Sequence, residues 1–136
     1  MKKLITPFAL LALFLATGCS KDSNAAAINS IQGRWKLVNV SGTFAGINNN
    51  FTPGTIVWDF NPITQTVTVV NNNPDPNKWD VLETGVYNYQ LVNNPEMPCN
   101  ESLEINGSSY GCFSISNNSL IIDQSVADGF FITLKQ

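Results

Sequence analysis

The feature that most constrains this chain is a succession of short β-favouring runs separated by Gly, Pro and Asn, with no convincing helical period. In the clearest run, Ile56, Trp58 and Phe60 fall on one face and alternate with smaller or charged residues. Such alternation sends one row of side chains into a core and the other to the surface. We predict strands at residues 34–44, 55–61, 66–71, 83–92, 102–105, 108–115, 120–123 and 130–135.

The turn residues support an antiparallel arrangement of these strands. Asn106-Gly107 predicts a two-residue hairpin turn, because both residues tolerate the positive φ that a type I′ turn requires. Asn117-Asn118 and Asp128-Gly129 indicate two more tight connections. Hairpin-linked strands without a crossover helix favour an antiparallel barrel or sandwich. We expect an all-β, eight-stranded antiparallel up-and-down barrel, since closure removes exposed strand edges.

The first 18 residues have the layout of a secretory signal peptide. Residues 1–3 are basic, residues 4–16 are almost wholly apolar, and Thr17-Gly18 supplies small residues before Cys19. The apolar stretch is shorter than the about 20 residues that a membrane-spanning helix needs. An amphipathic or core helix is disfavoured, because no polar face follows the two lysines. We therefore predict export and a signal peptide at residues 1–18.

The end of this segment, Leu15-Ala16-Thr17-Gly18-Cys19, resembles a bacterial lipoprotein signal, with Ala16 where Leu is commoner. The resemblance implies that the Cys19 thiol receives a diacylglycerol and that cleavage precedes Cys19. It also implies that the new amine is acylated, for example with palmitate. Two or three acyl chains, at roughly 0.8 kcal/mol per buried methylene, hold a protein on a membrane. The alternative is ordinary secretion. We expect Cys19 to be the lipid attachment site.

The segment after Cys19 divides into a flexible tether at residues 19–30 and one domain at residues 31–136. Without Lys2 and Lys3, five basic residues face ten acidic ones, which argues against nucleic acid as a partner. Residues 20–24, Ser-Lys-Asp-Ser-Asn, resemble the tethers of lipoproteins from the Bacteroidota. This resemblance implies an outer membrane lipoprotein of the cell envelope, on either the periplasmic or the cell-surface face.

The core also carries a resemblance. Residues 33–38, Gly-Arg-Trp-Lys-Leu-Val, resemble the first strand of lipocalin-like domains in lipoproteins of the Bacteroidota, and residues 120–123 and 128–131 resemble their endings. In that family the Gly-x-Trp strand closes one end of the barrel, often beneath a basic residue of the last strand. The resemblance thus assigns barrel closure to Gly33 and Trp35, with Lys135 as the covering residue. The Thr-Asp-Tyr loop motif is missing and the chain is short, which leaves a roomy cavity open to question.

The acid–base inventory argues against an enzyme. The chain has no histidine, which removes the usual general base and the commonest metal ligand. The pairs Glu101/Glu104 and Asp80/Glu83 are spaced to lie on opposite faces of a strand, so we interpret them as surface charges. Residues 71–80 faintly resemble a calcium loop but lack its central Gly and distant Glu. We expect no catalytic residues, no cofactor and no metal site.

Cys99 and Cys112 flank the Asn106-Gly107 turn, and an exported domain meets an oxidising compartment. With a two-residue turn, Cys112 would lie opposite Glu101, and the diagonal to Cys99 is slightly long for a disulfide. A wider loop or a β-bulge would bring the two thiols together. We predict a disulfide, and a buried or free pair is the alternative.

Two hypotheses for function remain. An eight-stranded barrel is either filled by side chains or wide enough for one small ligand. In the first hypothesis a monomeric barrel binds a small apolar ligand, with an interior lined by Trp58, Phe60, Tyr87 and Tyr89. Phe51 and Trp79, which lie in polar loops, would rim its mouth. In the second, the same aromatic residues fill the barrel, and the protein is a non-enzymatic interaction or structural module of the cell envelope.

Overall fold

The computed structural model describes residues 30–42, 46–93, 95–96, 98–99, 101–125 and 128–136. This part of the chain is all-β and contains no α-helix. Its strands are β1 (Gly33–Gly42), β2 (Ile47–Asn50), β3 (Ile56–Asn61), β4 (Thr66–Asn71), β5 (Gly85–Val92), β6 (Ser102–Ile105), β7 (Ser108–Ser116), β8 (Ser119–Asp123) and β9 (Phe130–Lys135). The eight predicted strands are all present, with ends that differ by at most two residues.

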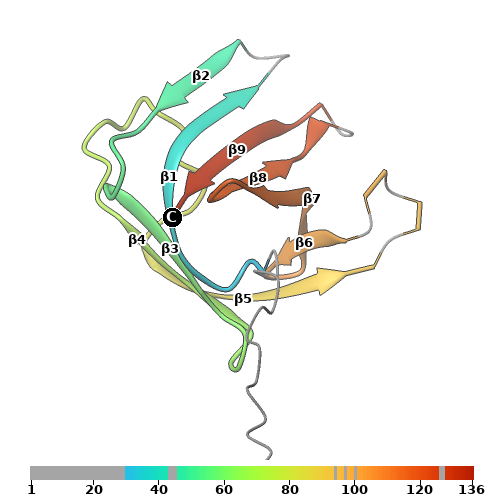
Figure 1. Ribbon diagram of the computed structural model, residues 1–136. Helices are drawn as coiled ribbons and strands as arrows, with labels where there is room; N and C mark the ends of the chain where they lie inside the picture. The colour runs from blue at the N-terminus through green and yellow to red at the C-terminus, as the bar shows by residue number, and fades with distance from the viewer. Residues whose placement is uncertain (1–29, 43–45, 94, 97, 100, 126–127) are drawn as a thin grey trace, which may run out of the picture.

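The strands form one antiparallel sheet in the order β2-β1-β3-β4-β5-β6-β7-β8-β9, and β9 returns to pair with β1 (Figure 1). This pairing confirms the predicted closed eight-stranded barrel. β2 is an additional strand that we did not predict. It pairs with Asn39–Gly42 of β1, beyond the segment Gly33–Lys36 that pairs with β3. Its sequence, Ile-Asn-Asn-Asn, has low β-propensity and was interpreted as a loop.

Two of the three predicted tight turns are confirmed. Asn106-Gly107 has φ of 50° and 76°, and Asn117-Asn118 has φ of 49° and 58°, as type I′ turns require. The connection that contains Asp128-Gly129 is longer than predicted and spans residues 124–129. Its ends are joined by Gln124, whose N–H donates to the Phe130 carbonyl at 2.9 Å.

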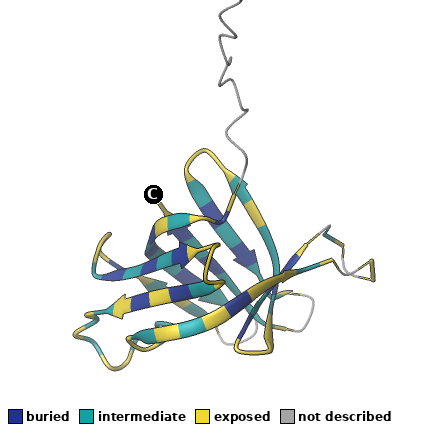
Figure 2. Cartoon of the chain, turned by 90° about the horizontal axis from the view of Figure 1, so that it is seen from below, coloured by how far each residue is buried: buried dark blue, intermediate teal, exposed yellow. Residues whose placement is uncertain are grey.

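Buried residues alternate with less buried ones along most of the strands (Figure 2), so one row of each strand faces the inside of the barrel and the other faces outward. The pairing of β1 with β9 shifts register between Leu37 and Asn39, so that Trp35, Leu37 and then Val40 are buried. The buried apolar core comprises Ile31, Trp35, Leu37, Val40, Phe51, Ile56, Trp58, Phe60, Val67, Val69, Tyr89, Leu103, Ile105, Leu120, Ile122, Ile132 and Leu134.

The two ends of the barrel are distinguished by their connections. We call the end where β1 begins, with the β3–β4 and β7–β8 turns, the lower end. The upper end carries the connections that follow β1, β4 and β8, of which residues 43–45 and 126–127 lie outside the described part.

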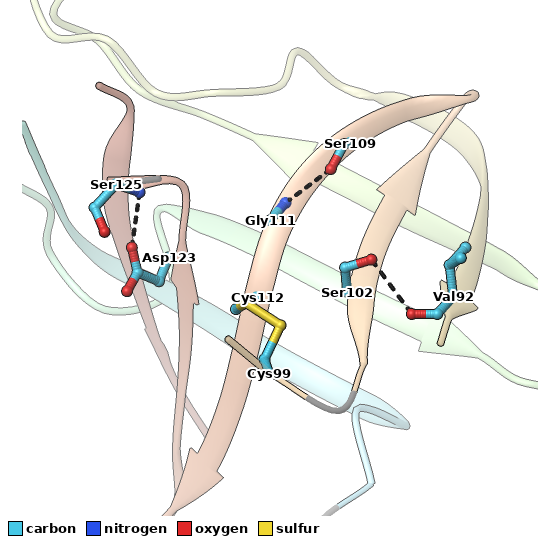
Figure 3. Close-up of a disulfide and its surroundings, with 8 residues drawn as sticks. All are labelled: Val92, Cys99, Ser102, Ser109, Gly111, Cys112, Asp123 and Ser125. Atoms are coloured by element: carbon cyan, nitrogen blue, oxygen red, sulfur yellow. Dashed lines mark hydrogen bonds between the residues drawn. A yellow bond between two sulfur atoms is a disulfide. The ribbon is translucent and has the colours of Figure 1, made fainter. Parts of the chain in front are cut away.

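Cys99 and Cys112 form the predicted disulfide, with their Cα atoms 5.7 Å apart (Figure 3). The register differs from the simple hairpin. β7 has one extra residue, Tyr110, so Cys112 lies opposite Ser102 rather than Glu101. The bulge therefore places Cys112 three residues along from Cys99 instead of two, and the disulfide forms because Cys99 lies in a bend before β6 rather than in the strand.

The bulge depends on Gly111. Its φ is 89°, and a Cβ atom at this position would lie 2.2 Å from the Asp123 carbonyl oxygen of β8. Gly107 has a similar φ of 76°, but no atom lies within 4 Å of the corresponding Cβ position. The two glycines therefore share a backbone conformation and differ in the space around them.

We predict that Gly107→Ala costs about 1–2 kcal/mol, the usual cost of a left-handed conformation for a residue with a Cβ. Gly111→Ala should cost a further 1–3 kcal/mol or so, because the added methyl group overpacks against backbone. Urea unfolding of the two variants measures this difference. Equal losses in the two variants would contradict the assignment of Gly111 as the close contact.

Candidate functional site

Trp35, in the first half of β1, is buried toward the lower end of the barrel. Its side chain is 1% exposed, and its Nε1 donates a hydrogen bond to the Ile31 carbonyl at 2.7 Å. Gly33 lies between these residues with φ of 100°, a conformation that few other residues adopt. Lys135 is exposed, and its neighbour Leu134 is buried, so Lys135 lies on the outer face of β9. The indole N–H of Trp35 thus finds its partner in the backbone of Ile31.

Three of the four predicted interior aromatic residues meet in the core. Trp58 and Phe60 are fully buried, with ring centroids 6.2 Å apart. The Tyr89 ring meets Phe60 edge-on at 5.1 Å, and burial raises the pKa of the Tyr89 hydroxyl. Tyr87 is only half-buried, and its hydroxyl donates to the Glu83 carbonyl at 2.9 Å. Tyr87 is therefore held against the connection between β4 and β5.

Phe51 and Trp79 lie at the same end of the barrel, but in different surroundings. Phe51 is 7% exposed and belongs to the core, whereas Trp79 is 37% exposed. Lys78, which precedes Trp79 in the chain, links the two residues. Its Nζ donates a hydrogen bond to the Asn50 carbonyl at 2.8 Å and lies 5.7 Å from the centroid of the Phe51 ring. These contacts place the β4–β5 connection beside β2 (Figure 1).

Trp79 packs on Phe130, the first residue of β9, with ring centroids 4.1 Å apart. Phe130 in turn packs over Gly42 of β1, where a Cβ atom would lie 2.7 Å from its ring. Gly42 thus leaves the space that Phe130 occupies, and Phe130 supports the indole of Trp79. Phe130 was not among the predicted site residues.

Partly buried apolar side chains pack against the core at the upper ends of the strands. We call this group the upper cluster; it comprises Val81, Leu82, Tyr87, Tyr110 and Phe130. Burial, and secondarily the nearby Tyr87, raise the pKa of the Tyr110 hydroxyl. Tyr110 could not be assigned from the sequence, because it is the extra residue of the β7 bulge. The bulge interrupts the alternation on which such an assignment depends.

The backbone beneath the upper cluster is strained at Val81. This residue has φ of 76°, and the Leu82 N–H donates to the Asp80 carbonyl at 2.9 Å. Together these describe a γ-turn of the rare form, which is unfavourable for a β-branched residue. Packing of Val81 and Leu82 against the core offsets that cost. Strain of this kind occurs preferentially at binding and switching sites.

Trp58 differs from Trp35 in its polar atom. The Trp58 Nε1 is buried and has no hydrogen-bond partner among the described residues. Trp58 and Trp35 lie opposite each other on β3 and β1, so the two indoles belong to the same region of the interior. The indole N–H of Trp35 has a hydrogen-bond partner, whereas the indole N–H of Trp58 is a buried donor without one.

A polar groove of about 490 Å³ crosses the wall of the barrel at β5, lined by Thr64, Gln65, Asn88, Tyr89, Gln90, Glu104, Asn106 and Gly107. It lies where β5 changes partner: pairing with β4 ends at Asn88 and pairing with β6 begins at Tyr89. The Asn106 side chain accepts a hydrogen bond from the Asn88 N–H at 3.0 Å and closes this junction. Half of the residues that line the groove therefore carry side-chain amides, and Glu104 adds one carboxylate.

The carboxylates do not converge. In the described part of the chain, no group of three or more His, Cys, Asp and Glu side chains is placed to hold a metal ion. Asp80 accepts a hydrogen bond from the Asn73 side chain at 3.1 Å, and Glu104 accepts one from Gln90. The loop that faintly resembles a calcium site is thus bound to itself through side-chain amides.

We predict that Trp35→Phe lowers the free energy of unfolding by about 1–2 kcal/mol more than Trp58→Phe does. Both changes remove the same atoms from the core, but only the first leaves a buried carbonyl, that of Ile31, without its donor. Urea unfolding measures the difference, with Trp79→Phe as the surface control. A larger loss for Trp58→Phe would contradict the hydrogen-bond assignment.

The predicted signal peptide, Cys19 and most of the tether lie outside the described residues. Within the described ranges, no helix is long and apolar enough to cross a membrane. No protein-family model matches the chain, and no curated protein or solved structure matches it significantly.

Proposed function

We propose that this chain is a membrane-anchored extracytoplasmic lipoprotein whose barrel binds a small apolar ligand at its upper end. The observation that carries the proposal is the difference between the two ends. Trp35 is buried toward the lower end, whereas the upper end carries the partly buried upper cluster and Trp79. Apolar surface that stays in contact with water at one end of a barrel is the surface that a ligand can cover.

The gain from covering this surface is substantial. Each Å² of apolar surface removed from water contributes about 25 cal/mol. Trp79 and Phe130 offer two rings in contact, tilted by 43° to each other, and aromatic rings bury more area than other side chains. Trp79 is carried by a connection that is tied to β2 through Lys78 and packed on the core through Val81. The rings are therefore positioned before a ligand arrives, which lowers the entropic cost of binding.

The position of the tether agrees with this proposal. The described chain enters the barrel at the lower end, just before Gly33. An acylated Cys19 at the far end of the tether would hold the lower end toward the membrane and turn the upper end toward the aqueous compartment. The residues between Cys19 and Ser30 extend at most about 3.3–3.6 Å each, enough to clear the headgroups.

A second candidate is a non-enzymatic interaction or structural module of the cell envelope. It is favoured by the filled core, in which Trp58 and Phe60 are at most 1% exposed. In this case the polar groove on the outer wall, with a volume of about 490 Å³, would be the recognition surface. Its amides suit a neutral polar partner, since amides both donate and accept hydrogen bonds.

We predict saturable binding of an apolar fluorescent dye, with quenching of tryptophan fluorescence and displacement by small apolar molecules. Phe130→Ala should weaken dye binding by about tenfold or more, because a buried Phe contributes about 1.5–3 kcal/mol. Phe131→Ala is the matched control: it removes the same ring from the outer face of the same strand. This control should stay within about twofold of the wild type.

Equal weakening in the Phe130 and Phe131 variants would exclude the upper end as the site. Complete absence of saturable binding to the folded wild-type protein would favour the second candidate instead.

The anchor has a separate test. Mass spectrometry of the protein from membranes should find an N-terminal peptide that begins with acylated Cys19. Cys19→Ser should release the protein from the membrane fraction, because the acyl chains supply the membrane affinity. A mature chain with an unmodified Cys19 would end the lipoprotein part of the proposal and leave the ligand-binding part intact.

A further inference from the structure

The unpartnered indole N–H of Trp58 indicates what kind of ligand the barrel takes. Trp58 is the third residue of β3 and is 0% exposed. Its Nε1 is the one buried side-chain nitrogen or oxygen that lacks a hydrogen-bond partner among the described residues. An indole nitrogen is a donor only, so it can be satisfied only by an acceptor.

The neighbours of Trp58 in the sheet cannot supply that acceptor from their side chains. Across the two flanking strands lie Trp35 of β1 and Val69 of β4. Phe60, the next residue on the same face of β3, has a hydrocarbon side chain without a hydrogen-bond acceptor. Tyr87, on β5, donates its hydroxyl proton to the Glu83 carbonyl, and its oxygen does not accept a hydrogen bond from Trp58. An unpaired buried donor costs stability, whereas a phenylalanine would fill much of the same space without that cost.

Trp58 is fully buried, so a ligand reaches it only by displacing side chains. On the inward face of β3, only Ile56 separates Trp58 from the upper end of the strand. Two strands away, Gly85 lies opposite Val69 and brings no side chain into the interior at this height. The ring of Tyr87 occupies that position instead, 3.2 Å from where a Cβ of Gly85 would be. Tyr87 is a member of the partly buried upper cluster, so it is the side chain that a ligand entering from the upper end would displace.

The charged side chains lie away from this donor. Arg34 pairs with Asp59 on the outer face, at 3.6 Å. Lys135 is exposed, and the Lys78 ammonium is bound to the Asn50 carbonyl at the upper end. Lys36 lies opposite Lys135, on the outer face of β1. A carboxylate brought to Trp58 would therefore be a buried charge without a counter-ion, which is strongly unfavourable.

We infer that Trp58 Nε1 donates a hydrogen bond to the ligand, and that the ligand is an apolar molecule with one neutral acceptor, such as a ketone or an ester. This inference rests on the proposed ligand-binding function and specifies it. The hydrocarbon part of the ligand lies against the upper cluster, and its acceptor oxygen reaches down to the indole nitrogen of Trp58.

The test uses three probes of one chain length, namely octane, 2-octanone and octanoate, in competition with the fluorescent dye. Their dissociation constants are measured on the full-length chain and on Trp58→Phe. The change between the two proteins isolates the hydrogen bond, because the water solubility of each probe cancels. For 2-octanone we expect Trp58→Phe to weaken binding by about tenfold, the usual worth of one buried hydrogen bond. For octane the two proteins should agree within about twofold.

A second readout does not depend on the variant being stable. The chain has three tryptophans, whose indole N–H groups give separate nuclear magnetic resonance signals. The Trp58 signal is identified by its disappearance in Trp58→Phe, or by selective labelling if that variant does not fold. On addition of 2-octanone this proton should move downfield and those of Trp35 and Trp79 should move less. Octane should not shift the Trp58 proton downfield.

The outcomes separate the two proposals. If octane and 2-octanone both bind but Trp58→Phe weakens them equally, or the Trp58 proton does not move, the inference about the acceptor fails and ligand binding stands. Tighter binding of octanoate than of 2-octanone through Trp58 would overturn the neutral acceptor. If none of the three probes displaces the dye and the dye itself does not bind, the proposed function fails as well.

Discussion

The pairing of β1 with β9 closes the sheet, and the core of this protein exists because of that closure. β1 pairs with β9 along one edge and with β3 and then β2 along the other. Once the sheet is closed, the inward residues of all its strands share one interior, and their apolar surface leaves the water together. A register shift between Leu37 and Asn39 keeps the inward row of β1 continuous through this pairing.

Closure also gives the barrel two unlike ends. At the lower end the segment before β1 lies beneath the barrel, so that Ile31 is buried and its carbonyl meets the indole of Trp35. At the upper end the long β4–β5 connection brings Trp79 onto Phe130 without burying either ring completely. Trp35 and Trp58, which lie opposite each other, therefore have different roles: one is satisfied by its own backbone, and the other retains an unused donor.

Much of the fold could be predicted because its signals are local. Alternation at Ile56, Trp58 and Phe60 indicated an inward row, and the three side chains are buried. Asn106-Gly107 forms the predicted turn because its conformation depends on two residues only. β2 was missed for the opposite reason. Its three asparagines are poor strand formers, and β1 holds them through hydrogen bonds from Asn39 to the Asn48 and Asn50 side chains.

The site was less predictable than the fold. Trp58 and Phe60 were identified as interior residues, but the sequence does not tell which indole N–H has a partner. That difference arises between residues that only the closed barrel brings together. Tyr110 was missed because the bulge at Gly111 breaks the alternation, and Phe51 is buried rather than at the mouth because β2 places it behind Val38, whose carbonyl accepts its N–H at 3.0 Å.

The amino-acid sequence alone determined the alternation of residues along the strands and the two type I′ turns. It also placed Cys99 and Cys112 only 13 residues apart, on either side of one hairpin turn. These properties depend on residues a few positions apart, whose backbone preferences act in any context. Tertiary structure decided the register of the disulfide, the hydrogen bond from Trp35 to Ile31, the absence of a partner for the Trp58 N–H and the contact between the Trp79 and Phe130 rings. Each of these depends on contacts between distant segments, which form only when β9 closes the barrel against β1.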